Sequence, residues 1–197
     1  MGCLKSSPTV EILRPVYLDA VRPIQVRLGV EESLTVYGLN PPWLINRNAF
    51  TNICTASSIN RNEHYWITAA HCVVNIGDEG RYIEGQAIEI VEINTETDLA
   101  VLKVAGYTAK ELRLRQSRPN WNQEIIVVGH PFGYPDLFVT RGYIANPLAV
   151  IDGVPFMVFD VAGAPGNSGS PVLSLKGELV SVLQIGWGQS FGPVTGG

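Results

Sequence analysis

The stretch that decides the fold is residues 166–172, which read Gly166-Asn167-Ser168-Gly169-Ser170-Pro171-Val172. Glycine before and after Ser168 lets the backbone adopt conformations that a Cβ would forbid. Such a turn can expose one hydroxyl and direct successive backbone N–H groups toward a single point. Acyl-transfer chemistry needs both features, an exposed nucleophile and donors for the developing oxyanion. A serine is inert at neutral pH without a base, so another part of the sequence must supply one.

A candidate base and a candidate carboxylate precede this stretch. His71 ends the segment Thr68-Ala69-Ala70-His71, after an apolar run at residues 65–67, and Asp98 stands at the mouth of another apolar run at 99–104. The order His71, Asp98, Ser168, in these contexts, resembles the chymotrypsin-like (trypsin-like) serine peptidases, since other triad folds use other orders. The resemblance spans about residues 53–194. It is closest in pattern to the HtrA-type and glutamyl-endopeptidase-like bacterial branches.

The resemblance implies a fold and a set of roles. The fold is all-β, with two antiparallel six-stranded β-barrels and the active site in the cleft between them. The activity is that of a serine endopeptidase, in which Ser168 attacks, His71 acts as the base and Asp98 orients the histidine. The backbone N–H groups of Gly166 and Ser168 would form the oxyanion hole. The alternative is a non-catalytic module that binds extended peptides on the same fold, although all triad candidates are present.

Other histidines and aspartates compete for these roles. His130 lies in a segment that resembles part of the second barrel of HtrA-type peptidases, and we expect it to be a turn histidine that bonds the backbone. We expect His64, among charged and polar neighbours, to be a solvated turn residue. The competing aspartates lack a matching apolar strand after them; they are Asp78, Asp136, Asp152 and Asp160.

Two cysteines flank the candidate base. In the family that this chain resembles, cysteines in the places of Cys54 and Cys72 pair across adjacent strands and hold the histidine loop. Such a bridge would close a loop of about 18 residues and contribute about 3 kcal/mol through loop entropy. Two buried thiols in a reducing cell are the alternative. A disulfide favours secretion or another oxidising compartment, whereas no basic region followed by an apolar run marks a secretory signal, so the localisation stays open.

Substrate specificity is implied by the same resemblance. The residue six before the nucleophile lies at the base of the S1 pocket, and here it is Ala162, followed by Gly163 and Ala164. No carboxylate is offered to a basic side chain, and Leu183 stands where glutamyl endopeptidases carry a histidine. A small or apolar P1 residue is therefore expected. The strand expected to form one pocket wall and to pair with the substrate backbone consists of Leu183, Gln184, Ile185 and Gly186.

Asn167 bears on activation. Animal trypsins have an aspartate before the nucleophile, which pairs with a newly cut N-terminal amine and switches the zymogen on. Asn167 cannot form that ion pair, and no activation sequence of the Ile-Val-Gly-Gly kind precedes the first barrel. We therefore expect no zymogen switch of the trypsin type.

The organisation of the chain follows from short apolar runs separated by turn signals. Residues 1–23 are expected to be an irregular lead-in, residues 24–108 the N-terminal barrel with His71 and Asp98, and residues 109–197 the C-terminal barrel with Ser168. The runs expected to be strands are 24–30, 34–37, 50–59, 65–70, 86–93 and 99–104, and then 124–128, 137–145, 156–161, 171–175, 178–185 and a short run near Val194.

The composition limits the classes of molecule that this chain is expected to bind. The 197 residues are 46% hydrophobic and 16% charged, with a net charge of −4 and no long basic run, which argues against nucleic acid. No apolar stretch approaches the roughly 20 residues needed to span a bilayer, and no cluster has metal-ligand spacing. We expect polypeptide substrates and neither cofactor nor metal. Gly2 and Cys3 fit the loose acylation pattern, whose alternative is coincidence; a lipid-anchored structural protein would rest on that pattern alone.

Overall fold

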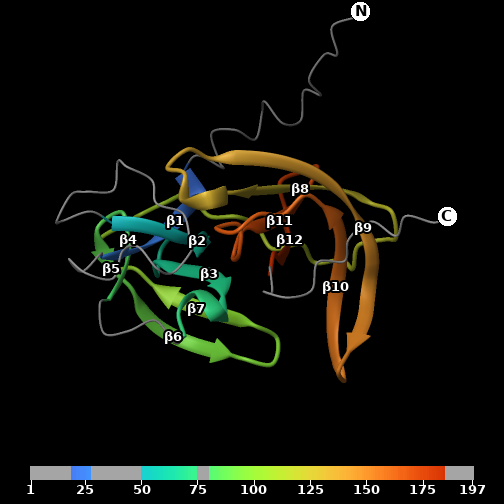
Figure 1. Ribbon diagram of the computed structural model, residues 1–197, viewed down its shortest axis with the longest axis horizontal. Helices are drawn as coiled ribbons and strands as arrows, with labels where there is room; N and C mark the ends of the chain where they lie inside the picture. The colour runs from blue at the N-terminus through green and yellow to red at the C-terminus, as the bar shows by residue number, and fades with distance from the viewer. Residues whose placement is uncertain (1–18, 28–49, 75–79, 185–197) are drawn as a thin grey trace, which may run out of the picture.

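The computed structural model describes residues 19–27, 50–74 and 80–184 (Figure 1). These residues form two curled antiparallel sheets that lie side by side, with short 3₁₀ turns η1 (Ala70–Cys72) and η2 (Pro131–Gly133). Within these ranges, no helix is long and apolar enough to cross a membrane. The prediction of an all-β fold with two antiparallel barrels is therefore confirmed, and each curled sheet forms a half-barrel.

The first sheet has seven strands in the order β5-β4-β1-β2-β3-β7-β6. Every neighbouring pair in it is antiparallel. The strands are β1 (Val21–Arg27), β2 (Phe50–Asn60), β3 (Tyr65–Ala69), β4 (Arg81–Ile83), β5 (Gln86–Ala87), β6 (Glu89–Asn94) and β7 (Leu99–Lys103).

The second sheet has five strands in the order β10-β9-β8-β11-β12, again antiparallel throughout. The strands are β8 (Glu124–Gly129), β9 (Phe138–Ile151), β10 (Val154–Val161), β11 (Pro171–Ser174) and β12 (Leu179–Val182). The division predicted between residues 108 and 109 stays a prediction, although β7 ends the first sheet in sequence and β8 begins the second.

The strand counts differ from the six per barrel expected from sequence. The expected runs at 34–37 and near Val194 lie outside the described residues, as do most of the lead-in and the acylation pattern at Gly2 and Cys3. The short strand β4 was not predicted from the sequence, because three residues are too few to show an alternation of apolar and polar side chains. The structure also starts β1 at Val21, inside the expected lead-in. Pro23 is tolerated there because it lies opposite Thr55 of β2, beyond the part of β1 that pairs with β4.

The burial of successive residues in each strand follows from the place of that strand in its sheet. In β7, Ala100 and Leu102 are buried and alternate with half-buried neighbours, as on a sheet with one covered face. In β8, Ile125 to Val128 are all buried, because this strand is central in its sheet and covered on both faces. The edge strand β6 is exposed along its whole length. Continuous burial of β8 makes the second sheet a rigid base for the loop that precedes β11.

Hydrophobic clusters fill each sheet and the space between them. Trp66, Ile24 and Leu102 belong to the cluster of the first sheet, and a separate cluster forms on the second. A third cluster joins the two halves, and its buried members are Ala20, Val21, Leu112, Ile126, Val128, Leu173 and Leu179. This shared core fixes the halves against each other and so positions residues contributed by both.

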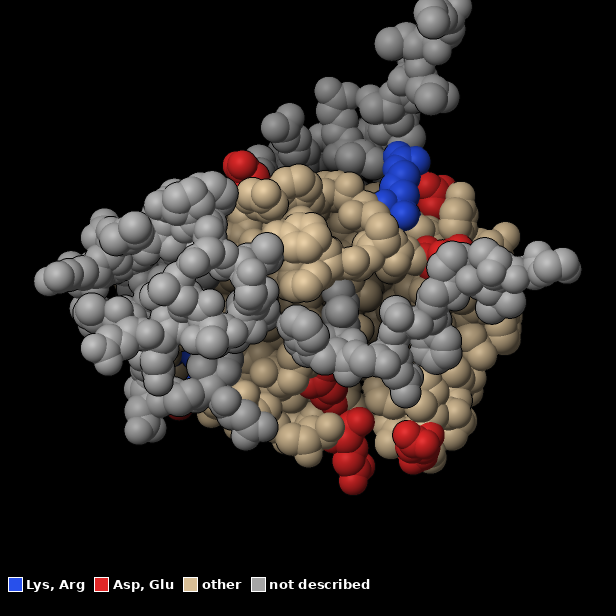
Figure 2. All heavy atoms as spheres, in the orientation of Figure 1, with Lys and Arg blue, Asp and Glu red and all other residues tan. Residues whose placement is uncertain are grey.

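The hairpin of β9 and β10 projects from the second sheet (Figure 1). Its tip, Asp152 and Gly153, has positive φ at both residues, as a tight hairpin turn requires. Leu148 and Val150 on this hairpin are exposed. Figure 2 shows that the described surface on this face is mostly uncharged, with acidic side chains near its lower edge and both acidic and basic side chains near its upper edge. Charged side chains on this face therefore lie mainly toward its edges.

Candidate active site

The histidine and the aspartate predicted from sequence lie in direct contact. The His71 backbone N–H donates to Asp98 Oδ1 at 2.8 Å, and His71 Nδ1 lies 2.7 Å from Asp98 Oδ2. A further bond runs from the Ala70 N–H to the Asp98 carbonyl, at 3.0 Å. A carboxylate at Nδ1 holds the proton on that nitrogen and leaves Nε2 as the acceptor. The pair therefore presents a histidine in the tautomer that a general base needs.

Strand register explains this contact. Ala69 at the end of β3 is paired with Leu99 at the start of β7. The residues that follow Ala69 and the residue that precedes Leu99 therefore lie side by side at the same end of this strand pair. Asp98 has a φ of +50°, a conformation that aspartate tolerates better than most residues. The Gln184 side chain donates to the carbonyl of Thr97 at 2.6 Å. Gln184 therefore supports the turn that carries Asp98.

The predicted disulfide is confirmed. Cys54 of β2 and Cys72 of η1 are joined, with their Cα atoms 6.0 Å apart. Both cysteines are buried, whereas His71 beside them is exposed. The two sulfurs and a His71 nitrogen lie within 4.8 Å of one another. Because the sulfurs are bonded to each other, they cannot act as thiolate metal ligands.

The nucleophile loop, residues 164–170, is held by its backbone. The Asn167 N–H donates to the Ala164 carbonyl, the Gly169 N–H to the Leu183 carbonyl and the Ser170 N–H to the Asn167 carbonyl. Among the described residues, no acceptor is present for the N–H of Gly166 or of Ser168. These are the two donors that the sequence assigns to the oxyanion hole, and they are the unused ones between residues 166 and 170.

Two glycines let this loop pack closely. Gly166 has a φ of +91°, and a Cβ there would overlap the His130 carbonyl. Gly169 has a φ of +83°, and a Cβ there would overlap the Thr55 carbonyl and the Thr68 hydroxyl. The second contact places the loop against β2 and β3 of the first sheet. Glycine is thus required at both positions by conformation and by space.

Ser168 is bound to the first sheet through its main chain. Its carbonyl accepts a hydrogen bond from the Thr55 N–H at 2.8 Å, and Ser168 itself is buried, as are its neighbours Asn167 and Ser170. The hydrogen bonds of the described residues do not include one between the Ser168 and His71 side chains. The structure therefore brings His71 and Asp98 into contact and anchors Ser168 to the neighbouring strand. Catalytic hydrogen bonds commonly tighten only when substrate binds.

Sequence reasoning missed two threonines at this junction. Thr55 and Thr68 are fully buried, and the Thr68 hydroxyl donates to the Thr55 carbonyl at 2.7 Å. The available signal was compositional, because Thr55, Ser57 and Ser58 place hydroxyls among the apolar residues of the stretch 53–59. Polar side chains in a buried strand need partners, and here the partners of Thr55 lie in the nucleophile loop.

The other two histidines bond backbone carbonyls. His130 is buried, with Nδ1 3.2 Å from the Tyr134 carbonyl, as expected for a turn histidine. Burial lowers its pKa below the ordinary value, with a smaller contribution from the Arg22 charge. His64 is half-buried, with Nδ1 3.0 Å from the Tyr107 carbonyl. His64 lies in a turn, as expected, but it is half-buried rather than solvated because the chain after β7 supplies the Tyr107 carbonyl beside it.

The predicted specificity residues are only partly described. Ala162 and Gly163 are exposed and Ala164 is half-buried, whereas Ile185 and Gly186 lie outside the described residues. Leu183 is buried, and its N–H and carbonyl bond Ser170 and Gly169. The main chain of Leu183 therefore supports the nucleophile loop from behind.

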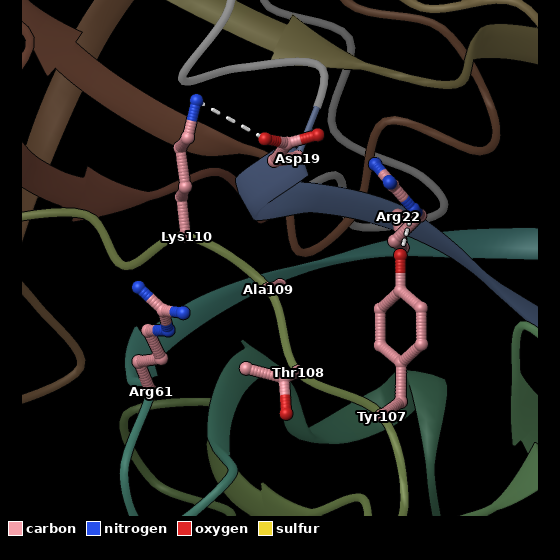
Figure 3. Close-up of a pocket in the computed structure, with 7 residues that line it drawn as sticks. All are labelled: Asp19, Arg22, Arg61, Tyr107, Thr108, Ala109 and Lys110. Atoms are coloured by element: carbon pink, nitrogen blue, oxygen red, sulfur yellow. Dashed lines mark hydrogen bonds and ion pairs between the residues drawn. The ribbon is translucent and has the colours of Figure 1, made fainter.

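A cavity of about 240 Å³ lies away from these residues, where the segment after β7 packs on β1 (Figure 3). Three of the four charged side chains that line it are paired, Lys110 with Asp19 at 3.2 Å and Arg22 with Glu84 at 2.9 Å. The Arg22 Nε also donates to the Tyr107 hydroxyl. None of the residues predicted for catalysis or specificity lines this cavity, which belongs to the join between the halves.

Comparison with known proteins identifies the family of the matched region. The model of the trypsin-like peptidase domain matches residues 53–182. Probable periplasmic serine endoproteases, DegP-like, from Pseudomonas putida and Halomonas elongata are 34% and 36% identical over 125 residues. Each match covers 61% of this chain and 25% of the relative, so the matched region is about a quarter of the relatives' length.

A solved structure supports the fold. The crystal structure of the Rv3671c protease from M. tuberculosis, active form, superposes with a TM-score of 0.64 at 18% sequence identity. The match covers 90% of this chain and 73% of that chain. At this identity the likeness concerns the fold alone. The family match, which spans more than half of the sequence and includes the three predicted triad positions, shows that this chain belongs to the family of trypsin-like peptidase domains.

Proposed function

We propose that this chain is a serine endopeptidase that uses His71, Asp98 and Ser168 as its catalytic triad. The observation that carries the proposal is the contact of His71 Nδ1 with Asp98 Oδ2 at 2.7 Å, which leaves Nε2 as a base. Ser168, from the other half, supports the proposal because it lies in a loop where the N–H groups of Gly166 and Ser168 have no acceptor among the described residues.

The proposed reaction has two stages. His71 Nε2 takes the proton of the Ser168 hydroxyl while Oγ attacks the scissile carbonyl carbon, and the resulting oxyanion accepts from the N–H groups of Gly166 and Ser168. His71 then gives that proton to the departing amine, which leaves an acyl-enzyme. A water molecule loses a proton to His71 and attacks the ester, and the proton returns to Ser168 as the acid departs.

The proposed substrate is an extended polypeptide with a small or apolar P1 residue. Ala162 and Gly163, at the predicted pocket base, are exposed and bring no carboxylate toward a basic side chain. A pocket of this kind discriminates by only about 10–200-fold per methylene, so cleavage should be tolerant among small and apolar residues. Profiling with a peptide library tests this preference, and selective cleavage after Lys or Arg would contradict it.

Labelling with a fluorophosphonate probe tests the triad. The native chain should be labelled, and Ser168→Ala and His71→Ala should abolish labelling while retaining the thermal unfolding midpoint within a few degrees. A useful control is Ser174→Ala, which removes a serine of β11 outside the loop and should leave labelling intact. A folded native chain that does not react would contradict the proposal and favour the peptide-binding alternative.

The confirmed disulfide supports an oxidising compartment for this chain. The relatives' own names describe periplasmic enzymes, and the same kind of compartment would suit Cys54 and Cys72. Alkylation of the chain taken directly from its host, followed by mass spectrometry, tests this proposal. Recovery of both cysteines as alkylated thiols would contradict it. Acylation at Gly2 or Cys3 stays a prediction, and mass spectrometry of the N-terminal peptide would test it.

A further inference from the structure

We propose that Thr55 is a positioning residue that holds the Gly166 N–H in line for the oxyanion. This inference rests on the proposed function and adds a residue that the triad does not include. Thr55 belongs to β2, in the half that carries His71, and its side chain is fully buried. Its contacts reach the nucleophile loop and the strand that leads to the histidine.

The Thr55 hydroxyl joins two backbone groups of the second half. Its Oγ1 donates to the Gly166 carbonyl at 3.0 Å and accepts from the His130 N–H at 3.1 Å. A hydroxyl can fill both roles at once because it carries one proton and two lone pairs. The His130 N–H would be left without a partner inside the fold if the hydroxyl were removed, because His130 is buried, whereas Gly166 is half-buried.

Gly166 needs such an external constraint. With no Cβ it can rotate through conformations closed to other residues, and it sits at a φ of +91°. The peptide before it is fixed by the Phe132 N–H, which donates to the Pro165 carbonyl at 2.5 Å. The peptide after it is fixed by the Thr55 hydroxyl. The direction of the Gly166 N–H is therefore set by anchors on both sides, and one of them is a side chain.

Thr55 also ties this loop to the base. Its N–H donates to the Ser168 carbonyl at 2.8 Å, and its carbonyl accepts from the Thr68 hydroxyl. Thr68 lies three residues before His71 in the same segment, and Cys54, next to Thr55, is bonded to Cys72. One residue thus fixes the nucleophile loop relative to the strand and turn that place the histidine.

The position of Thr55 in its strand explains why it is available. The pairing of β2 with β3 ends at Ser57, so Thr55 lies beyond that ladder. The loop fills the space where the two strands separate, because a Cβ on Gly169 would meet both the Thr55 carbonyl and the Ala69 nitrogen. Ser57, two residues further along β2, is equally buried but its hydroxyl has no partner in the described part of the chain.

Three variants of the full chain separate positioning from simple packing. Thr55→Val keeps the shape and removes the hydroxyl, Thr55→Ser keeps the hydroxyl and removes a methyl, and Ser57→Ala removes a buried hydroxyl that does not reach the loop. Each is assayed for kcat and KM on an apolar peptide substrate. Each is also assayed for affinity toward a peptide trifluoromethyl ketone, whose tetrahedral adduct carries an oxyanion.

Thr55→Val should lower kcat by about 10–100-fold, which is a smaller effect than the loss of a whole oxyanion donor. KM should change by less than about 3-fold, because Thr55 does not bind the substrate. Affinity for the ketone should fall in parallel with kcat/KM. Thr55→Ser should stay within about 3-fold of the native chain, and Ser57→Ala should match it. If Thr55→Val does not fold, Thr55→Ala is read in the same way, since it removes the same hydroxyl without placing a methyl against the Gly166 carbonyl.

Native kcat and native ketone affinity in Thr55→Val would overturn the inference while leaving the triad proposal intact. Equal losses in Thr55→Val and Thr55→Ser would also overturn it, because packing and not the hydroxyl would then be responsible. A failure of the triad proposal is recognised separately, since the native chain itself would then be inert toward the fluorophosphonate.

Discussion

The histidine side and the serine side of the candidate site are held by different kinds of contact. On the histidine side, a side-chain carboxylate bonds His71 twice, and a disulfide ties the next residue to β2. On the serine side, the nucleophile loop is held by backbone hydrogen bonds, by Gly169 packed against Thr55 and Thr68, and by Gly166 packed against the His130 carbonyl. Both sides meet on β2, through Cys54 and Thr55.

This difference determines what mutation can change. A base held by side chains can be misdirected by one substitution that leaves the fold intact. A loop held by its backbone resists side-chain substitution, except where a glycine allows close packing or a buried hydroxyl serves as an anchor. We therefore expect substitution of the Asp98 side chain to remove activity and leave stability nearly unchanged. We expect substitution of a loop glycine such as Gly169 to lower activity and stability together.

Among variants that keep both His71 and Ser168, the largest expected effect is that of Asp98→Asn. Asparagine keeps the shape and tolerates the positive φ of this position, but it no longer stabilises the proton on Nδ1 of His71. We expect kcat to fall by about 10⁴-fold, with an unfolding midpoint close to the native one. A steady-state assay and thermal unfolding of the same preparation test this. A loss of less than about tenfold would remove Asp98 from the triad.

Gly169→Ala probes the serine side. The added methyl would overlap the Thr55 carbonyl and the Thr68 hydroxyl, and the positive φ is unfavourable for alanine. We expect a loss of about 3 kcal/mol or more in the free energy of unfolding, together with most of the labelling by a fluorophosphonate. Urea titration measures the first quantity. Gly153→Ala, at a hairpin tip with open space around it, is the control for the positive φ alone.

Removal of the disulfide should lower stability more than activity. Cys54→Ala with Cys72→Ala opens a loop with a sequence separation of 18 residues, for which the loop-entropy estimate is about 3 kcal/mol. His71 keeps both bonds to Asp98, so kcat should fall by less than about tenfold at a temperature where the variant is folded. An equal unfolding free energy in both chains would show that the bridge is not a constraint on the fold.

The smallest expected effect concerns pH and His130. Burial lowers the pKa of His130 in the folded chain, so only the unfolded chain takes up this proton as the pH falls through about 6.5. Stability from this group is therefore complete above that pH and declines below it. His130→Gln, which can still donate to the Tyr134 carbonyl, should lose less stability between pH 7.5 and 5.5. Parallel losses in the two chains would contradict this assignment.

The parts of the site that sequence predicted are those with local patterns. His71, Asp98 and Ser168 each stand in a short segment with a recognisable neighbourhood, and their order along the chain indicated the fold. The pairing of Cys54 with Cys72 followed from the same likeness. Local pattern was enough because each of these residues is placed by the strand or turn that contains it.

The parts that sequence could not predict depend on distant partners. The Thr55 hydroxyl bonds a carbonyl 111 residues away, and a backbone acceptor leaves no trace in residue type. Gln184 was assigned to the substrate wall, yet its amide bonds the turn of Asp98, because the two halves meet there. Pro23 was interpreted as a marker of irregular chain, but β1 pairs with β2 along its whole length and with β4 only beyond Pro23, so the proline is accommodated within a strand.

The central claim is that residues from both halves act as one catalytic unit, and a double-mutant cycle tests it most directly. Peptide cleavage is measured for the native chain, His71→Ala, Ser168→Ala and the double variant. Each single substitution should lower kcat by about 10⁶-fold, and the double variant should be no slower than either single one. A double variant slower by the product of the two single effects, or a His71→Ala chain that retains more than about 1% of native activity, would contradict the account.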